Sequence, residues 1–105
     1  MKIKIKEHSL LAKLAAKNLN SNKMAMAFGN TIRLHNTSKE EFLKNITWVR
    51  HEVAHIMQSK KKGVIIFLLS YLLESFYVGY QFNKYEVEAI KMERNDSILD
   101  DIEFI

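Results

Sequence analysis

The spacing of hydrophobic and polar residues changes along the chain, and these changes mark where strands and helices are expected. Lysine alternates with isoleucine over Lys2–Lys6, which predicts a short strand. The segments Met24–Phe28 and Thr31–His35 flank Gly29-Asn30, a pattern typical of a β-hairpin with a two-residue turn. Between the first strand and the hairpin, Ser9 can cap a helix that continues to about residue 19.

The longest helical pattern covers residues 39 to about 60. Ser38 and Glu41 form an S-x-x-E capping box in front of it. Hydrophobic residues then recur at spacings of three or four, as one buried stripe of a helix requires: Phe42, Ile46, Val49, Val53 and Ile56. Three lysines and Gly63 close the pattern with the usual signals of a helix end. A single uninterrupted helix is therefore expected here.

The segment 63–82 is almost entirely apolar. Its length approaches the roughly 20 residues that cross a bilayer. Glu74 lies near its middle, however, and a carboxylate there opposes insertion. We expect a helix from Val64 to about Tyr80 that is buried in the core of the protein. The alternative is peripheral association with a membrane, assisted by the cluster of Lys60, Lys61 and Lys62.

A last helix is expected from Asn83 through Glu93, followed by an acidic tail, 97–105, without a clear pattern. Together these elements predict an α+β fold, in which a short hairpin or small sheet packs beside a helical core. The chain has 105 residues, which suits one domain, 1–105, and is too short for two.

Composition narrows the classes of function. The chain is 48% hydrophobic and 27% charged, which is typical of a globular protein. It contains no cysteine, which excludes a disulfide framework, a cysteine zinc site and a thiol nucleophile. The net charge of +4 comes from scattered lysines without a nucleic-acid-reading motif, so no nucleic-acid partner is expected. The first residues lack the apolar region of a signal peptide, which favours a cytoplasmic location.

The strongest chemical signal is the run His51-Glu52-Val53-Ala54-His55, an H-E-x-x-H motif. Residues four apart lie on the same face of a helix, so His51 and His55 can bind one Zn²⁺. Glu52 is offset around the helix. It can reach a water molecule beside the metal and act as a general base there.

A catalytic zinc site needs a third protein ligand. His8 and His35 are isolated and far upstream, so a downstream carboxylate is the better candidate: Glu74, Glu86, Glu88 or Glu93. If the helices on either side of Gly63 pack antiparallel, Glu74 comes level with the histidines. Glu86, on the following helix, also comes level with the histidines. Helix lengths alone do not decide which of the two glutamates is the third ligand.

The H-E-x-x-H run and the later Glu86-Val87-Glu88-Ala89 resemble the gluzincin metallopeptidases. Glu86 and Ala89 match the E-x-x-A-D pattern of the CAAX-prenyl-protease-like branch, whose first Glu binds zinc. Ile90 stands where that pattern has an Asp, which orients a zinc-bound histidine. Glu74 instead gives the H-E-x-x-H-x₁₈-E spacing of the aminopeptidase N type. The H-E-x-x-H-x-x-Q helix, the apolar second helix and the E-x-E-A motif are similar to small minigluzincin-like bacterial proteins.

The resemblance implies a zinc metallopeptidase whose metal ligands are His51, His55 and Glu86, with Glu74 as the alternative third ligand. Glu52 would be its general base, and its substrate would be a peptide or protein. The strand Thr31–His35, if it borders the cleft, could pair with an extended peptide. A tyrosine often stabilises the oxyanion in such enzymes, and four remain open: Tyr71, Tyr77, Tyr80 and Tyr85. The rival hypothesis is a non-catalytic zinc-binding or interaction module.

Overall fold

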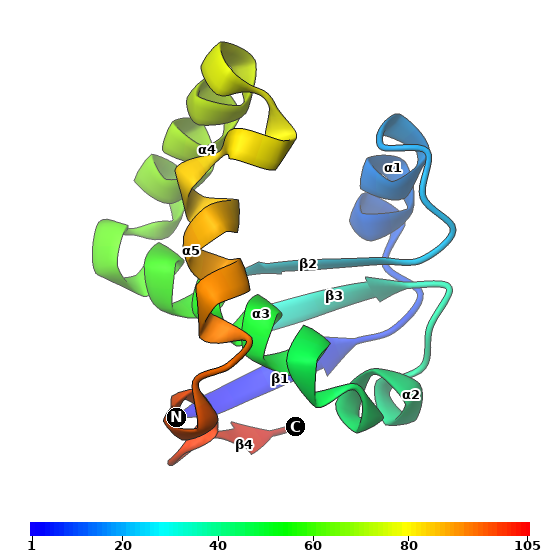
Figure 1. Cartoon of the computed structure of the whole chain (residues 1–105). Coiled ribbons are helices and arrows are strands. Elements are labelled where there is room, and N and C mark those ends of the chain that lie inside the picture. Colours follow the sequence, from blue (N-terminus) through cyan, green and yellow to red (C-terminus); the bar gives the residue numbers. More distant parts are fainter.

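Four strands form one mixed sheet in the computed structural model, which describes residues 1–105 (Figure 1). The strands are β1 (Lys2–Lys6), β2 (Met24–Phe28), β3 (Thr31–His35) and β4 (Glu103–Phe104), and their order across the sheet is β2-β3-β1-β4. β2 and β3 pair antiparallel, whereas β1 is parallel to both β3 and β4. The predicted first strand and hairpin are confirmed.

Five α-helices surround the sheet: α1 (Leu10–Asn18), α2 (Lys39–Lys44), α3 (Ile46–Lys62), α4 (Val64–Val78) and α5 (Lys84–Met92). Two 3₁₀ turns follow α4 and α5, namely η1 (Tyr80–Phe82) and η2 (Asp96–Leu99). α3 runs across the sheet and α5 packs against α3, whereas α4 and α1 stand on the left and right of the view (Figure 1). The predicted α+β class is confirmed, including the motif-bearing helix and the downstream glutamate helix.

The hairpin turn is tied to α3. Phe28 pairs with Thr31, which leaves two residues in the turn. Gly29 adopts φ 65°, a conformation that glycine reaches without a steric penalty. Its backbone N–H donates to Ser59 Oγ at 2.9 Å. This bond fixes one end of β2 against the helix that carries the H-E-x-x-H motif.

The single helix expected from residue 39 is interrupted at Asn45, so that prediction was wrong. Asn45 has φ −92° and ψ 84°, and its side chain accepts a hydrogen bond from the Trp48 backbone N–H at 3.2 Å. Asparagine competes with helix interiors in this way because its side chain satisfies the free N–H groups of a new helix start. Ile46 therefore lies in a first turn and is 45% exposed, although the stripe predicted that it is buried.

The rest of the stripe builds the core. The largest buried hydrophobic cluster joins one face of the sheet to α2 and α3, and its members are Ile3, Ile5, Ala27, Ile32, Leu34, Phe42, Val49, Val53 and Ile56. Burial of each large side chain contributes about 1.5–3 kcal/mol. The core thus holds the motif-bearing helix rigidly against the sheet.

The apolar helix α4 is not buried, contrary to the prediction. Phe67 is its one buried residue, and most of its other large side chains face solvent. The physical reason is that α4 packs on α3 and η1 along one side, and no other element covers the opposite side. None of the helices combines the length and the apolar character that a membrane-spanning helix requires.

The acidic tail, for which no pattern was evident, completes the sheet. β4 pairs with β1 through Lys2 with Glu103 and Ile3 with Phe104. The Ile5 N–H also donates to the Ile105 carbonyl at 3.0 Å. A strand of two residues is too short to produce a recognisable alternation.

Candidate metal centre and its cleft

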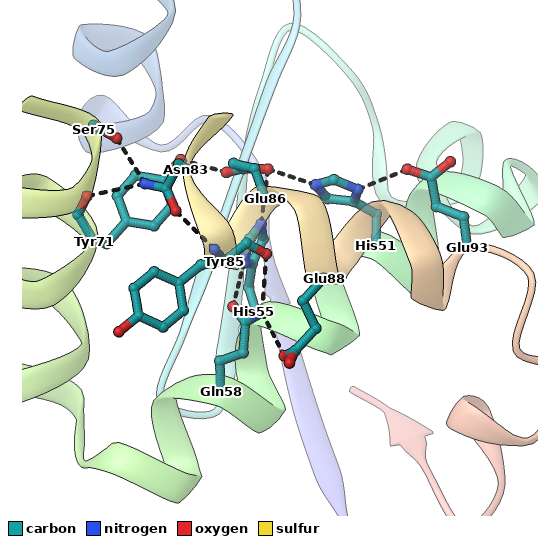
Figure 2. Close-up of polar contacts among 10 residues, drawn as sticks. All are labelled: His51, His55, Gln58, Tyr71, Ser75, Asn83, Tyr85, Glu86, Glu88 and Glu93. Carbon is teal, nitrogen blue, oxygen red and sulfur yellow. Dashed lines mark hydrogen bonds and ion pairs between the residues drawn. The ribbon is translucent and has the colours of Figure 1, made fainter. Parts of the chain in front are cut away.

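Two helices bring three metal-ligand side chains together. α3 presents His51 and His55 one turn apart, with ring centroids separated by 5.0 Å. α5 places Glu86 opposite them (Figure 2). Glu86 Oε1 lies 2.9 Å from His51 Nε2 and 3.3 Å from His55 Nε2. All three ligand atoms lie within 4.8 Å of one another.

The second nitrogen of each imidazole has its own acceptor. His51 Nδ1 lies 2.8 Å from Glu93 Oε2, and His55 Nδ1 lies 2.8 Å from Gln58 Oε1. The Gln58 amide nitrogen donates to the Tyr85 carbonyl at 3.0 Å and to Glu88 Oε1 at 2.9 Å, which leaves its oxygen for His55. Each Nδ1 therefore carries a hydrogen, and each Nε2 points at Glu86. Such outer partners fix the tautomer of metal-binding histidines.

The charges at the centre require a cation or a proton between the ligands. Two Nε2 lone pairs and a carboxylate oxygen would otherwise face one another at hydrogen-bond distance. Burial alone lowers the pKa of His51, but the Glu86 bond, the Glu52 charge and the Glu93 bond outweigh it and raise that pKa to about 9. Burial likewise opposes the charged form of His55, yet its bond to Glu86 raises its pKa. Proton binding thus takes the place of metal binding when no metal is present.

Glu86 is held as an anion. Burial raises its pKa, but the hydrogen bonds from His51 and His55 are stronger and hold the pKa well below its usual range. Its second oxygen accepts a hydrogen bond from the Tyr71 hydroxyl, which fixes the carboxylate plane. Burial and this carboxylate raise the pKa of Tyr71, so the tyrosine stays a donor.

The donor set fits a zinc ion. His₂Glu is a common set for catalytic zinc. In a tetrahedral site with bonds of 2.0–2.1 Å, ligand atoms lie about 3.3 Å apart. The 2.9 and 3.3 Å separations at Glu86 Oε1 are close to that value.

Glu52 lies beside this centre and is itself buried. Burial raises its pKa to about 7, although the nearby charges of His55 and His51 lower it. A carboxylate with a pKa near neutrality can both accept and release a proton at physiological pH. Glu52 and His51 line a cleft of about 440 Å³, together with Met24, Ala25 and Tyr80.

The cleft is bordered by β2, not by β3. β3 pairs with β2 on one side and with β1 on the other, so its backbone groups are already used. The condition for peptide pairing at Thr31–His35, that this strand borders the cleft, is therefore not met. β2 is the edge strand on that side of the sheet, and Met24 and Ala25 place it at the cleft.

The four tyrosines have different surroundings. Tyr71 donates to Glu86, and Tyr85 is buried with no partner for its hydroxyl. Tyr77 is exposed on α4. Tyr80, on η1, lines the cleft with Glu52, and burial together with the charges of Glu86 and Glu52 raises its pKa to about 12. Tyr80 is the tyrosine placed to meet a molecule in the cleft.

The other candidate ligands lie outside the cluster. Glu74 Oε2 accepts a hydrogen bond from the Lys84 backbone N–H at 3.2 Å, so it caps the start of α5. Glu88 accepts from Gln58, one step removed from the histidines. The predicted ligand group His51, His55 and Glu86 is brought together, whereas His8 and His35 are not part of it. Whether these side chains bind metal stays a prediction.

Two outer residues were given no such role by the sequence. Gln58 follows His55 by three positions and lies on the same face of α3 as the histidine that it supports. Glu93 follows Glu86 by seven positions and shares its helix face, from which it reaches His51 on α3. Ile90, at the place of the family's Asp, is exposed. Glu93 supplies the carboxylate for His51 from about one turn further along. The i,i+7 spacing of Glu86 and Glu93 in the sequence could have indicated that both face the histidines.

Asn83 joins α4 to α5 beside the centre. Its buried amide nitrogen donates to the Tyr71 carbonyl at 3.0 Å and to Ser75 Oγ at 2.8 Å (Figure 2). Its oxygen accepts from the Tyr85 N–H at 2.8 Å and thus caps α5. Asn83, three positions before Glu86, is therefore bonded to both α4 and α5, which positions the proposed third ligand.

No protein-family model, curated protein or solved structure matches the chain. The function of the chain is therefore inferred from the geometry of the centre and its cleft.

Proposed function

We propose that the chain is a zinc-dependent metallopeptidase. The observation that carries this proposal is the convergence of both histidine Nε2 atoms on Glu86, with each Nδ1 held by a separate acceptor. An accidental surface pair of histidines has no reason to be supported by outer partners on both rings. We place the activity in the cytoplasm, a location with which a cysteine-free chain is compatible.

Glu52 is the proposed general base. Bound zinc would supply the electrostatic activation of the attacking water and of the scissile carbonyl. Glu52 would accept one proton from that water as its oxygen forms a bond to the carbonyl carbon. It would then release the proton to the amide nitrogen as the carbon–nitrogen bond breaks. Its pKa of about 7 suits both transfers.

The edge of β2 is the proposed site for substrate. An unpaired strand edge can hold an extended peptide through backbone hydrogen bonds. Met24 and Ala25 line the same cleft as His51 and Glu52, so a peptide paired there would pass the centre. This supports a peptide or an unfolded protein segment as the substrate class.

Tyr80 is the proposed oxyanion donor. Its raised pKa keeps the hydroxyl protonated, so it can donate to the negative charge that develops on the carbonyl oxygen. Tyr71 is already bonded to Glu86, and Tyr77 is turned to the outer surface of α4. A Tyr80→Phe variant should retain its zinc and lose peptidase rate.

The deciding experiment compares wild type with Glu52→Gln at matched zinc content. We expect about one zinc per chain in both proteins, and a rate for the variant lower by roughly 10²–10⁴ on unfolded protein or mixed peptides. The amide is nearly isosteric and does not carry the burial penalty of a charge, so the variant should be at least as stable. His35→Ala serves as a control because His35 lies outside the cluster.

The outcomes separate the two hypotheses from the sequence. Equal cleavage by wild type and Glu52→Gln would exclude Glu52 as the base. Bound zinc without cleavage across a broad screen would favour the non-catalytic zinc-binding module. Absence of zinc from protein purified without a metal-affinity tag would reject the metal centre itself.

A further inference from the structure

The outer side of α4 is a continuous apolar surface. At about 100° per residue, six exposed positions fall within one arc of the helix: Ile65, Ile66, Leu69, Leu72, Leu73 and Phe76. Each is between 54% and 84% exposed. Tyr77 extends the same arc, and no charged residue interrupts it. We call these six residues the α4 outer face.

The α4 outer face extends over about three helical turns, about 17 Å at 1.5 Å per residue. Contiguous apolar patches of this kind mark interaction sites. The inner side of α4 is already used, because Phe67 is buried and Tyr71 is bonded to Glu86. Any partner must therefore meet the helix from outside, with the helix lying flat against it.

Positive charges cluster next to the first turn of α4. Lys60, Lys61 and Lys62 are exposed where α3 ends and α4 begins, and Lys84 is exposed soon after α4. Lys61, Lys62 and Lys84 line one groove with Tyr85 and Glu88, so one carboxylate lies among three lysines and the local charge remains positive.

The acidic residues of the tail lie elsewhere. They follow α5, near the two termini, at the opposite end of the view from the far tip of α4 (Figure 1). The apolar surface is therefore combined with local positive charge and separated from the acidic end of the protein.

The geometry points to an anionic phospholipid bilayer as the occupant of the α4 outer face. A partner helix packed on α4 would need only a narrow apolar stripe, and such helix pairs commonly contain a polar residue that fixes their register. A protein interface also needs hydrogen-bonding groups around an apolar centre. The α4 outer face is wide and has no polar position. Apolar side chains beside a lysine cluster match the acyl and headgroup layers of a charged membrane.

Vesicle co-sedimentation of the full chain tests this proposal. We expect wild type to bind vesicles of phosphatidylcholine mixed with phosphatidylserine, and to bind pure phosphatidylcholine weakly. Raising the salt concentration should weaken binding, since the lysine contribution is screened. The triple variant Leu69→Gln, Leu73→Gln, Phe76→Gln should reduce affinity at least about tenfold. Lys60→Gln, Lys61→Gln and Lys62→Gln should each reduce it by about fivefold.

Matched controls make the test specific. Leu10→Gln with Leu14→Gln changes two exposed leucines on α1 and should leave vesicle binding unchanged. All of these positions are exposed, so thermal unfolding should confirm that every variant is folded. Binding should be the same with and without zinc, which separates this proposal from the metallopeptidase proposal.

Three results would overturn the proposal. One is equal binding to neutral and anionic vesicles, or no binding to either. Another is an equal loss of binding in the α1 control. The third is a lipid-free dimer in analytical ultracentrifugation that the α4 triple variant dissociates, because the α4 outer face would then belong to a second copy of the chain.

Discussion

Helices α3 and α4 follow each other in the chain, yet they use their side chains in opposite ways. α3 has five residues of type Lys, Arg or Glu among seventeen, and it buries eight residues, four of which are polar. α4 has one charged residue among fifteen and buries a single side chain. The more polar helix is thus the one in the interior.

The difference shows that burial follows the available partners and not the hydrophobicity of a segment. α3 lies between the sheet and α5, so its histidines find partners on α5, on the residue that ends α5, and on α3 itself: Glu86 and Glu93 for His51, and Glu86 and Gln58 for His55. A buried polar group is tolerated when it is bonded in this way. α4 has a neighbour on one side only, and its apolar side chains remain outside.

A matched pair of isoleucines should give the largest contrast. Ile56 on α3 is 0% exposed and Ile65 on α4 is 73% exposed. We expect Ile56→Ala to lower the free energy of unfolding by about 2–5 kcal/mol, because it leaves a cavity in the core. Ile65→Ala should change it by less than about 0.5 kcal/mol. Urea unfolding of both variants checks this, and equal losses would mean that α4 is covered in solution.

A matched pair of glutamates tests the centre against α4. Glu86→Ala should reduce zinc affinity by more than the roughly 100-fold that loss of an outer partner can cause, because a direct ligand is removed. Glu74→Ala should retain zinc, since Glu74 caps α5 at a distance from the histidines. Competition with a chromogenic chelator measures both. If zinc followed Glu74 instead, the structure of the α4–α5 connection would be wrong.

Glu93 should have a smaller effect on the same measurement. Glu93→Ala removes the acceptor from His51 Nδ1 and should weaken zinc binding by about 10–100-fold. Glu93→Gln keeps an accepting oxygen and should therefore lose less zinc affinity than Glu93→Ala. Glu103→Ala, at the far end of the sheet, is the control. An unchanged affinity in Glu93→Ala would show that His51 needs no orienting partner.

The dependence of the free energy of unfolding on pH should be the smallest of these effects. Without metal, the His51 contribution to stability is complete below its ordinary pKa of 6.5 and is lost as pH rises through about 9. The raised pKa of Glu52 acts in the same direction, with loss complete above about 7. Glu86 acts oppositely, because its lowered pKa gives stability that is lost as the solution is acidified below 4.5.

Zinc should reverse the trend above neutrality. Metal binding displaces protons from the histidines, so affinity should increase by about tenfold per pH unit for each proton released. We therefore expect the zinc-induced rise in Tm to be larger at pH 8 than at pH 6. Differential scanning calorimetry with and without zinc checks this. An equal rise at both values would indicate that the histidines are not the ligands.

Local signals in the sequence were sufficient for most elements of the fold. The Ser38–Glu41 capping box and Gly29 each act within a few residues of themselves, and the structure has the corresponding helix start and turn. The spacing of His51 and His55 also depends only on helix geometry. The interruption at Asn45 was missed because one asparagine does not disturb the hydrophobic periodicity around it.

Features set by tertiary packing could not be derived in the same way. Helix lengths brought Glu74 and Glu86 to similar levels, but they say nothing of how each helix is rotated about its axis. Rotation turns Glu86 toward the histidines and Glu74 toward Lys84. The exposure of α4 likewise depends on which elements remain to cover it, and no property of its own residues specifies that.

Folding of the sheet depends on the pairing of β1 with β4. The Met1 ammonium donates to the Asp101 carbonyl, 100 positions away, and the adjacent ladder joins the first strand to the last. Contacts of such sequence separation form slowly, because a long loop must close before they contribute. During synthesis β1 is made before β4, so the edge of β1 that pairs with β4 stays unpaired until β4 has been made. We therefore expect the hairpin and α3 to assemble early, and the edge of β1 to be the segment of the sheet most open to aggregation until the tail arrives.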